Sequence, residues 1–294
     1  MAKLSRQTKE TIKTIIVLII VGLLLTAYAI YPLNNSDTLF ARADLDSYQV
    51  DSLPPNEISV FDNPEWVIDT FRVETDGLTS IACIGISDTT IDSIVGTVIL
   101  IPSSNSTRDS LLPLIDVLTS NAHTCVTYDQ RATGLSSGKY HGFGSIEAHD
   151  LQEIIGYLEI HSQIVHPLYI IGTDLGADAA VLAAQEDSRI KKIVAIDPFL
   201  TTDNVIEAAK KTHSSIWFPF YNTVMFWWYQ MNSGYAPNYI ELENIQAVNC
   251  TTILLMHTNN QATEKLKEIS DSSVLHVETY KSLNVENIIT FLLN

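Results

Sequence analysis

The sequence has few cysteines, few basic residues and few charges of any kind. Its three cysteines, Cys83, Cys125 and Cys250, are too few for a disulfide scaffold and too widely spaced for a CxxC metal pair, so we predict no metal and no cofactor. Lysine and arginine total 17 against 34 acidic residues, and a net charge of -17 argues against a nucleic-acid partner. With 46% hydrophobic residues over 294 positions, the chain can bury a large core, which excludes collagen, coiled coil and disorder.

One long uncharged run stands apart from the rest of the composition. Residues 15–33 carry no charge, and Lys3, Arg6, Lys9 and Lys13 precede them. Nineteen helical residues reach about 28 Å at roughly 1.5 Å per residue, close to the hydrocarbon thickness of a bilayer. The basic flank predicts a cytoplasmic N-terminus (1–13), a transmembrane anchor (14–33) and an exported remainder, periplasmic in a bacterium.

Two alternatives to the retained anchor remain. Ala27, Tyr28 and Ala29 have the small-x-small form of a signal-peptide cleavage site, although the apolar run is longer than a usual signal peptide's. A buried helix of a soluble protein is the other alternative, which the one-sided charge flank disfavours. Residues 34–64 are polar, contain Pro54 and Pro55, and show no periodicity, so we interpret them as a linker.

The remainder, 65–294, alternates strand and helix patterns. Strands are predicted on both sides of a turn at Asp76 and Gly77, and at 97–101, 124–128, 168–171, 192–196, 251–256 and 274–279; helices are predicted at 108–119, 146–160, 174–184 and 285–293. A hairpin followed by repeated strand-helix units predicts an α/β domain with a mostly parallel sheet covered on both faces.

The strand at 168–171 continues directly into the sequence GTDLG and an alanine-rich helix. This pattern is typical of a nucleophile elbow, in which two glycines allow close packing around a strained central residue. The central residue here is Asp174, where a serine is usual.

Two segments resemble α/β-hydrolases. YDQRATGLSSGKYHGFGSIEAHDLQEIIGYL (128–158) resembles the family's D-x-R-G-H-G-x-S-G stretch, and IIGTDLGADAAVLAAQEDSRIKKIVAIDPF (170–199) resembles its elbow, following helix and sixth strand. The similarity covers about 66–294 and is closest to bacterial membrane-anchored serine hydrolases of the aminopeptidase and acyl-esterase types. It implies the α/β-hydrolase fold with a cap insertion at about 199–245.

The catalytic positions implied by this resemblance are substituted. Asp174 occupies the serine position, Gln261 the acid position and Leu283 the histidine position. Pro102 and Ser103 replace the His-Gly of the oxyanion loop, which leaves the backbone N–H groups of Ser104 and Leu175 as oxyanion candidates. Ala132 and Thr133 also replace Gly-His. Such clustered departures indicate loss of the ancestral chemistry.

Several groups still have two interpretations. Asp174 resembles the carboxylate nucleophile of dehalogenases and epoxide hydrolases, or it is a polar remnant at a helix N-terminus, the interpretation we favour because no activating histidine is found. Asp197 is either the acid of the site or a structural residue, and His257 either faces the site or is only hydrogen-bonded at a strand end. For both residues we favour the structural role. His276 lies inside a strand, which disfavours it as a base. Cys83 and Cys125 are expected on neighbouring strands, where they either form a disulfide after export or remain free thiols. We favour the free thiols.

Eight aromatic residues fall within thirteen positions of the cap insertion. They are Trp217, Phe218, Phe220, Tyr221, Phe226, Trp227, Trp228 and Tyr229. Such a cap binds an apolar small molecule or a protein partner, packs on the main domain, or contacts the membrane interface. The sequence therefore predicts a membrane-tethered protein with a degenerate triad that binds without catalysis; the alternative is a hydrolase that uses Asp174 or other residues.

Overall fold

The computed structural model describes most of the chain. Described are residues 6–40, 63–77, 79–104, 106–201, 204, 221–234, 250–256, 275–279 and 285–293. The strands are β1 (Trp66–Thr75), β2 (Thr79–Asp88), β3 (Gly96–Ile101), β4 (His123–Tyr128), β5 (Leu168–Thr173), β6 (Ile190–Ile196), β7 (Thr251–Met256) and β8 (Leu275–Thr279). The helices are α1 (Arg6–Phe40), α2 (Leu112–Ser120), α3 (Ser145–Ile160), α4 (Leu175–Glu186), α6 (Tyr221–Ser233) and α8 (Val285–Leu293), and a short 3-10 helix precedes α2.

All eight strands form one mixed sheet. Its order is β1-β2-β4-β3-β5-β6-β7-β8. The hairpin strand β2 pairs antiparallel with β1 and with β4, and every other pair is parallel. The predicted α/β architecture with a mostly parallel sheet is confirmed, and each predicted strand and helix occurs within a few residues of its expected bounds.

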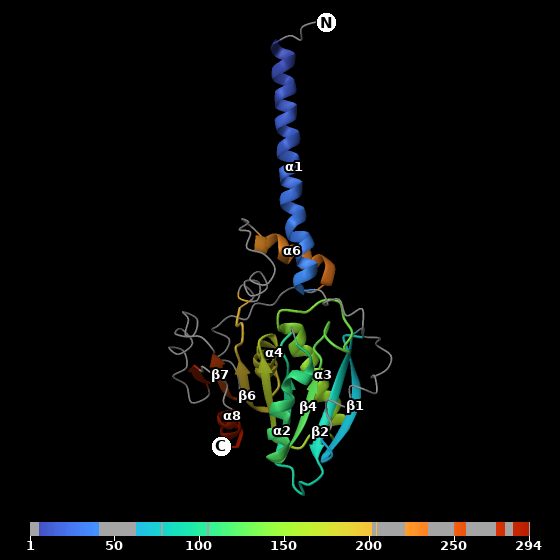
Figure 1. Ribbon diagram of the computed structural model, residues 1–294, viewed down its shortest axis with the longest axis vertical. Helices are drawn as coiled ribbons and strands as arrows, with labels where there is room; N and C mark the ends of the chain where they lie inside the picture. The colour runs from blue at the N-terminus through green and yellow to red at the C-terminus, as the bar shows by residue number, and fades with distance from the viewer. Residues whose placement is uncertain are drawn as a thin grey trace.

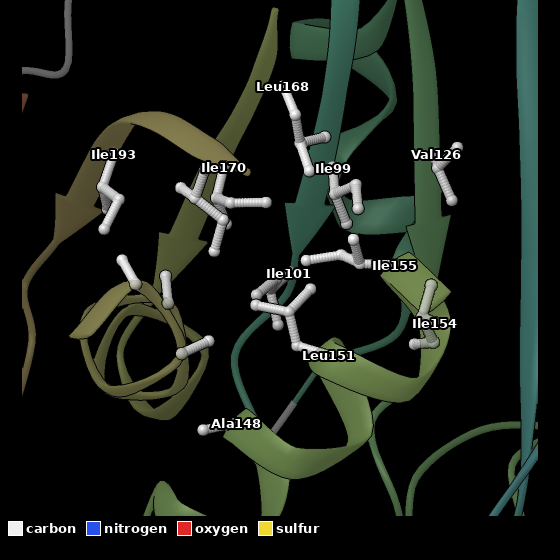
Figure 2. Packing of buried hydrophobic residues seen from close by; sticks show 14 of the residues in the cluster. Ile99, Ile101, Val126, Ala148, Leu151, Ile154, Ile155, Leu168, Ile170 and Ile193 are labelled. Atoms are coloured by element: carbon white, nitrogen blue, oxygen red, sulfur yellow. The ribbon is translucent and has the colours of Figure 1, made fainter. Parts of the chain in front are cut away.

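The sheet is buried on both faces, because successive residues of a strand alternate between two hydrophobic clusters. Ile99 and Ile101 of β3 face α3 and α4, whereas Val98 and Leu100 face α2 and α8. Figure 2 shows Leu151, Ile154 and Ile155 of α3 directed at β3 and β4. Helix α4 instead packs through small residues; those buried are Ala177, Ala179, Ala180, Ala183 and Ala184.

The three cysteines are free and buried. Cys83 pairs in register with Tyr128, whereas Cys125 pairs with Ile86. The two cysteines are therefore offset by an odd number of positions along the paired strands, which puts their side chains on opposite faces of the sheet. Cys83 accordingly belongs to the cluster under α3, and Cys125 to the cluster under α2. The sheet separates them, which is why they do not form the disulfide considered above.

Helix α1 extends away from the domain (Figure 1). It contains one segment, Glu10–Ala27, that is long and apolar enough to cross a membrane, and the side chains of that segment are exposed. The helix continues to Phe40, so the first residues of the predicted linker are helical. Residues 41–62 of that linker, and most of the predicted cap, lie outside the described residues.

Candidate functional site

Asp174 lies at the sharp turn between β5 and α4. Its backbone has φ 50° and ψ -117°, a combination that L-residues rarely adopt. The turn is held on both sides: the Asp174 N–H donates to the carbonyl of Ile196 at 2.9 Å, and its carbonyl accepts from Ala177 at 3.0 Å and Asp178 at 3.2 Å. The backbone therefore has the strained form expected of a nucleophile elbow.

Two glycines make this turn possible. A Cβ on Gly172 would overlap the carbonyl group of Gly176. A Cβ on Gly176 would lie 2.7 Å from both the carbonyl oxygen of Pro102 and Cγ2 of Ile101. Any larger residue at either position would force α4 away from β3 and β5, so the close approach requires glycine.

The Asp174 carboxylate is partly buried in an acidic environment. Burial raises its pKa, the Ser103 hydroxyl opposes the shift by donating a hydrogen bond, and the nearby charge of Asp197 adds to it. Within the described part of the chain, no histidine, lysine or arginine bonds to this carboxylate. The group therefore lacks, among these residues, the partner that would activate a water against an ester intermediate.

Each of the two oxyanion candidates is the next residue in the chain after one partner of the hydrogen bond between Ser103 and Asp174. Ser104 comes directly after Ser103 in the loop that follows β3, and Leu175 comes directly after Asp174 as the first residue of α4. The Ser104 carbonyl accepts a hydrogen bond from the Thr133 hydroxyl at 3.4 Å. The carboxyl ends of β3 and β5 thus bring these backbone segments to one edge of the sheet, next to Asp174.

A second loop, after β4, reaches the same edge and is fixed by buried ion pairs. Arg131 pairs with Asp150 of α3 at 2.6 Å and with Asp76 at 3.2 Å. Asp129 pairs with Arg108 at 3.3 Å and also accepts the backbone N–H of Leu135 at 2.9 Å. Losing one partner would leave an uncompensated buried charge, so these contacts rigidify the loop.

The structure adds His141 to this region, a residue that the sequence analysis did not single out. Its Nε2 lies 3.3 Å from the Thr133 hydroxyl, and its Nδ1 is buried without a hydrogen-bond partner. Burial and, secondarily, the charge of Arg131 lower its pKa to about 4, so the ring is neutral near pH 7. A line of contacts therefore joins Ser104, Thr133 and His141.

Asp178 is a second residue that the sequence analysis missed, although a charged residue in an alanine-rich helix was a visible signal. It is fully buried in the first turn of α4, and it accepts the backbone N–H groups of Leu200 at 3.0 Å and Phe199 at 3.3 Å. Burial raises its pKa to about 8, the two hydrogen bonds oppose the shift, and Asp174 and Glu147 add to it. Asp178 thereby holds the segment after β6, which contains Asp197, against the elbow helix.

The aromatic cap is represented in the structure by α6. Trp227 is exposed, Trp228 is partly buried with an indole Nε1 that is buried and unpaired, and Tyr229 is buried. The Tyr229 hydroxyl donates to the carbonyl of His141 at 2.7 Å, and its ring packs edge-on against Phe143 and Tyr140. The helix is thus attached to the loop that carries His141.

Other predicted site residues fall in parts that the structure does not describe. Gln261, Leu283, His257, Trp217 and Phe220 lie outside the described residues, and of Tyr221 only its place at the start of α6 is described. His276 is exposed on β8. Among the described residues there is no group of three or more histidine, cysteine or acidic side chains that could hold a metal ion.

Comparison with known proteins supports the fold. Residues 96–237 match the family model of the alpha/beta hydrolase fold. An esterase from Pyrococcus furiosus is similar in structure, with 19% identity, a TM-score of 0.60, and coverage of 83% of this chain and 91% of the esterase. No curated protein matches the sequence.

Two further structures are similar at lower identity. An alpha/beta hydrolase from a Penicillium species has 14% identity and a TM-score of 0.55, covering 77% of this chain and 96% of its own. An enol-lactonase from Burkholderia xenovorans has 12% identity and a TM-score of 0.54, covering 76% and 100%. At these identities the likeness establishes the fold and leaves the chemistry to the site itself.

Proposed function

Given a chain with the α/β-hydrolase fold, we propose that it is a membrane-tethered binding protein whose serine-hydrolase machinery has been replaced. It holds an apolar ligand or a protein surface under the aromatic cap without hydrolysing it. The anchor is α1, which carries the apolar segment Glu10–Ala27. The resemblance to membrane-anchored serine hydrolases indicates descent from such an enzyme. The substituted residues Asp174, Gln261 and Leu283 at the three catalytic positions indicate that its activity has been lost.

The environment of Asp174 carries this proposal. Partial burial and the nearby Asp197 charge raise the pKa of the Asp174 carboxyl, and one of its oxygens already accepts a hydrogen bond from the Ser103 hydroxyl, which makes that lone pair less available for attack. Its described surroundings provide no base. A group held in this way suits hydrogen bonding to a ligand better than attack on one.

The cap supplies the binding surface. Trp228 is partly buried, and its unpaired indole N–H is a donor that a polar end of a ligand can use. Aromatic residues contribute large contact areas at low entropic cost, and they commonly dominate binding energies. Trp228 is therefore the residue on which we expect ligand affinity to depend most.

A second function is favoured by one observation, the retained strain at Asp174. Backbone conformations of this kind cost about 1–3 kcal/mol and concentrate at functional sites. An Asp-nucleophile hydrolase would explain why that strain persists without serine. In this alternative a water-activating base must come from residues that the structure does not describe, or from His141 after movement toward Asp174.

The test compares binding and turnover in the same full-length protein. The probe is a fluorescent fatty acid ester, with binding followed by anisotropy and hydrolysis by product release. We expect Asp174→Asn to bind as the unmodified protein does, and Trp228→Ala to weaken binding at least tenfold, the usual scale for an aromatic hot spot. Trp66→Ala, on the first residue of β1, is the matched tryptophan control and should leave binding unchanged. Release of product that disappears in Asp174→Asn would instead establish the hydrolase.

A further inference from the structure

Helix α6 has an exposed face on which two large apolar side chains, those of Trp227 and Met231, lie beside the polar Thr223 and Gln230. Its thirteen residues, YNTVMFWWYQMNS, include no charged side chain. Trp227 is 58% exposed and Met231 is 62% exposed, and a spacing of four residues puts both on one side of the helix. Tyr229, between them in sequence, is 2% exposed and bonds to the His141 carbonyl. One side of α6 is therefore anchored to the domain, while the opposite side presents a tryptophan and a methionine.

Helix α6 lies beside the end of the apolar helix that is nearest the domain. Helices α1 and α6 are in contact, and Figure 1 shows α6 lying across α1 at the end of α1 nearest the domain. The uncharged run of α1 ends near Leu33, and the helix continues for seven residues to Phe40, about 10 Å at 1.5 Å per residue. In a bilayer spanned by α1, the position of α6 is the boundary between hydrocarbon and water.

Tryptophan and tyrosine favour this boundary, because their rings are apolar and their N–H and O–H groups can bond to water and headgroups. We propose that α6 is an interfacial helix whose Trp227 and Met231 insert into the leaflet on the domain side of the bilayer that α1 spans. The occupant of this exposed face is thus the lipid surface itself. The inference rests on the proposed tether, because without α1 in a bilayer nothing holds α6 at this depth.

The charge of the domain specifies which lipid surface fits. Residues 34–294 contain 13 basic against 33 acidic residues, a net charge of -20, and α6 adds no basic residue of its own. Anionic headgroups attract polybasic segments and repel an acidic domain. The interface therefore suits zwitterionic lipid, with insertion driven by apolar contact and not by charge.

One consequence concerns the site. The loop that α6 holds through Tyr229 is the loop after β4, which also carries Thr133 and His141. Insertion of α6 orients this carboxyl edge of the sheet, with Asp174, toward the membrane. An apolar ligand held under the cap would then reach the site from the leaflet without crossing water.

The experiment measures the depth of one tryptophan in the full-length protein. The chain has four tryptophans, so Trp66→Phe, Trp217→Phe and Trp228→Phe together leave Trp227 as the only emitter. The protein is placed in phosphatidylcholine nanodiscs whose acyl chains are brominated near the headgroup or near the bilayer centre. We expect the shallow bromines to quench Trp227 strongly and the central ones weakly. A matched variant that keeps only Trp66, at the edge of the sheet where β4 begins, should not be quenched by either.

The outcomes separate the two proposals. A protein that fails to remain with the discs overturns the tether, and the interfacial helix with it. A protein that remains with the discs while Trp227 is unquenched overturns the interfacial helix alone, as does protection of Trp227 by a second copy or by a bound protein. If the triple replacement does not fold, the unmodified protein is compared with Trp227→Phe. The proposal then requires that the part of the tryptophan fluorescence quenched by the shallow bromines is lost in Trp227→Phe.

Discussion

Replacing Asp174 by glycine and, separately, by alanine tests whether the elbow is strained. Both changes remove the carboxylate and its bond to Ser103, so those losses cancel in the comparison. At φ 50° and ψ -117° a residue with a Cβ pays a backbone cost of about 1–3 kcal/mol, whereas glycine ordinarily destabilises by about 0.5–1 kcal/mol relative to alanine. We therefore expect Asp174→Gly to be about 0.5–2 kcal/mol more stable than Asp174→Ala.

The assay is urea unfolding of the full chain in mild detergent, followed by circular dichroism, with thermal unfolding as a second measure. For a domain of this size each kcal/mol shifts Tm by about 2–4 °C. The matched control is Gly156→Ala, in the middle of α3, where an added Cβ meets no atom within 4 Å. There alanine should be the more stable residue by about 0.5–1 kcal/mol. If alanine is also more stable than glycine at position 174, the backbone is not strained and the elbow interpretation is refuted.

Four further predictions concern pH, reactivity and topology. The Asp178 pKa is raised from 3.8 to about 8 in the folded protein, so its contribution to stability is present below pH 4 and is lost as pH rises toward 8; Asp178→Asn should flatten this slope in urea titrations at pH 5 and pH 8. The His141 pKa is lowered from 6.5 to about 4, so its contribution is present above pH 6.5 and is lost as pH falls toward 4; His141→Gln should remove this loss, and an unchanged acid slope would contradict it. Fluorophosphonate probes should label neither the unmodified protein nor Asp174→Ser, because a serine without a base is a weak nucleophile, and stoichiometric labelling in the gel would disprove the degenerate site. Protease added outside intact cells, after any outer membrane is permeabilised, should digest residues 66–294; protection until the inner membrane is broken would reverse the topology.

Most of the fold could be predicted from the sequence because its signals are local and repeated. The strand at 97–101 is a continuous apolar run, and the turn after 171 is marked by two glycines at fixed spacing. The end of α1 could not be predicted in the same way, since residues 34–38 are polar and show no periodicity, yet the helix continues through them to Phe40. The sequence pattern also left the thiol pairing open, and only the register of β2 with β4 puts Cys83 and Cys125 on opposite faces.

The site was less accessible to sequence reasoning, because its contacts join residues that are distant along the chain. Asp174 stood out through the glycines around it, but its partner Ser103 lies 71 positions earlier and stood out only as a substituted residue of the oxyanion loop, with no sign that its hydroxyl would reach Asp174. His141 enters the region only because Arg131 and Asp150 fix the loop after β4. The role of Asp178, which holds the segment after β6 against α4, is visible only from its hydrogen bonds with the backbone N–H groups of Phe199 and Leu200.

The central claim is that the carboxylate of Asp174 does not act as a nucleophile. Full-length protein is incubated in oxygen-18 water with p-nitrophenyl esters of short and long acyl chains and with a terminal epoxide, and the peptide that contains Asp174 is then analysed by mass spectrometry. A carboxylate nucleophile must acquire heavy oxygen when water hydrolyses its ester intermediate. We predict an unchanged mass for this peptide with every substrate. Heavy oxygen in Asp174 would contradict the account and establish the protein as a hydrolase.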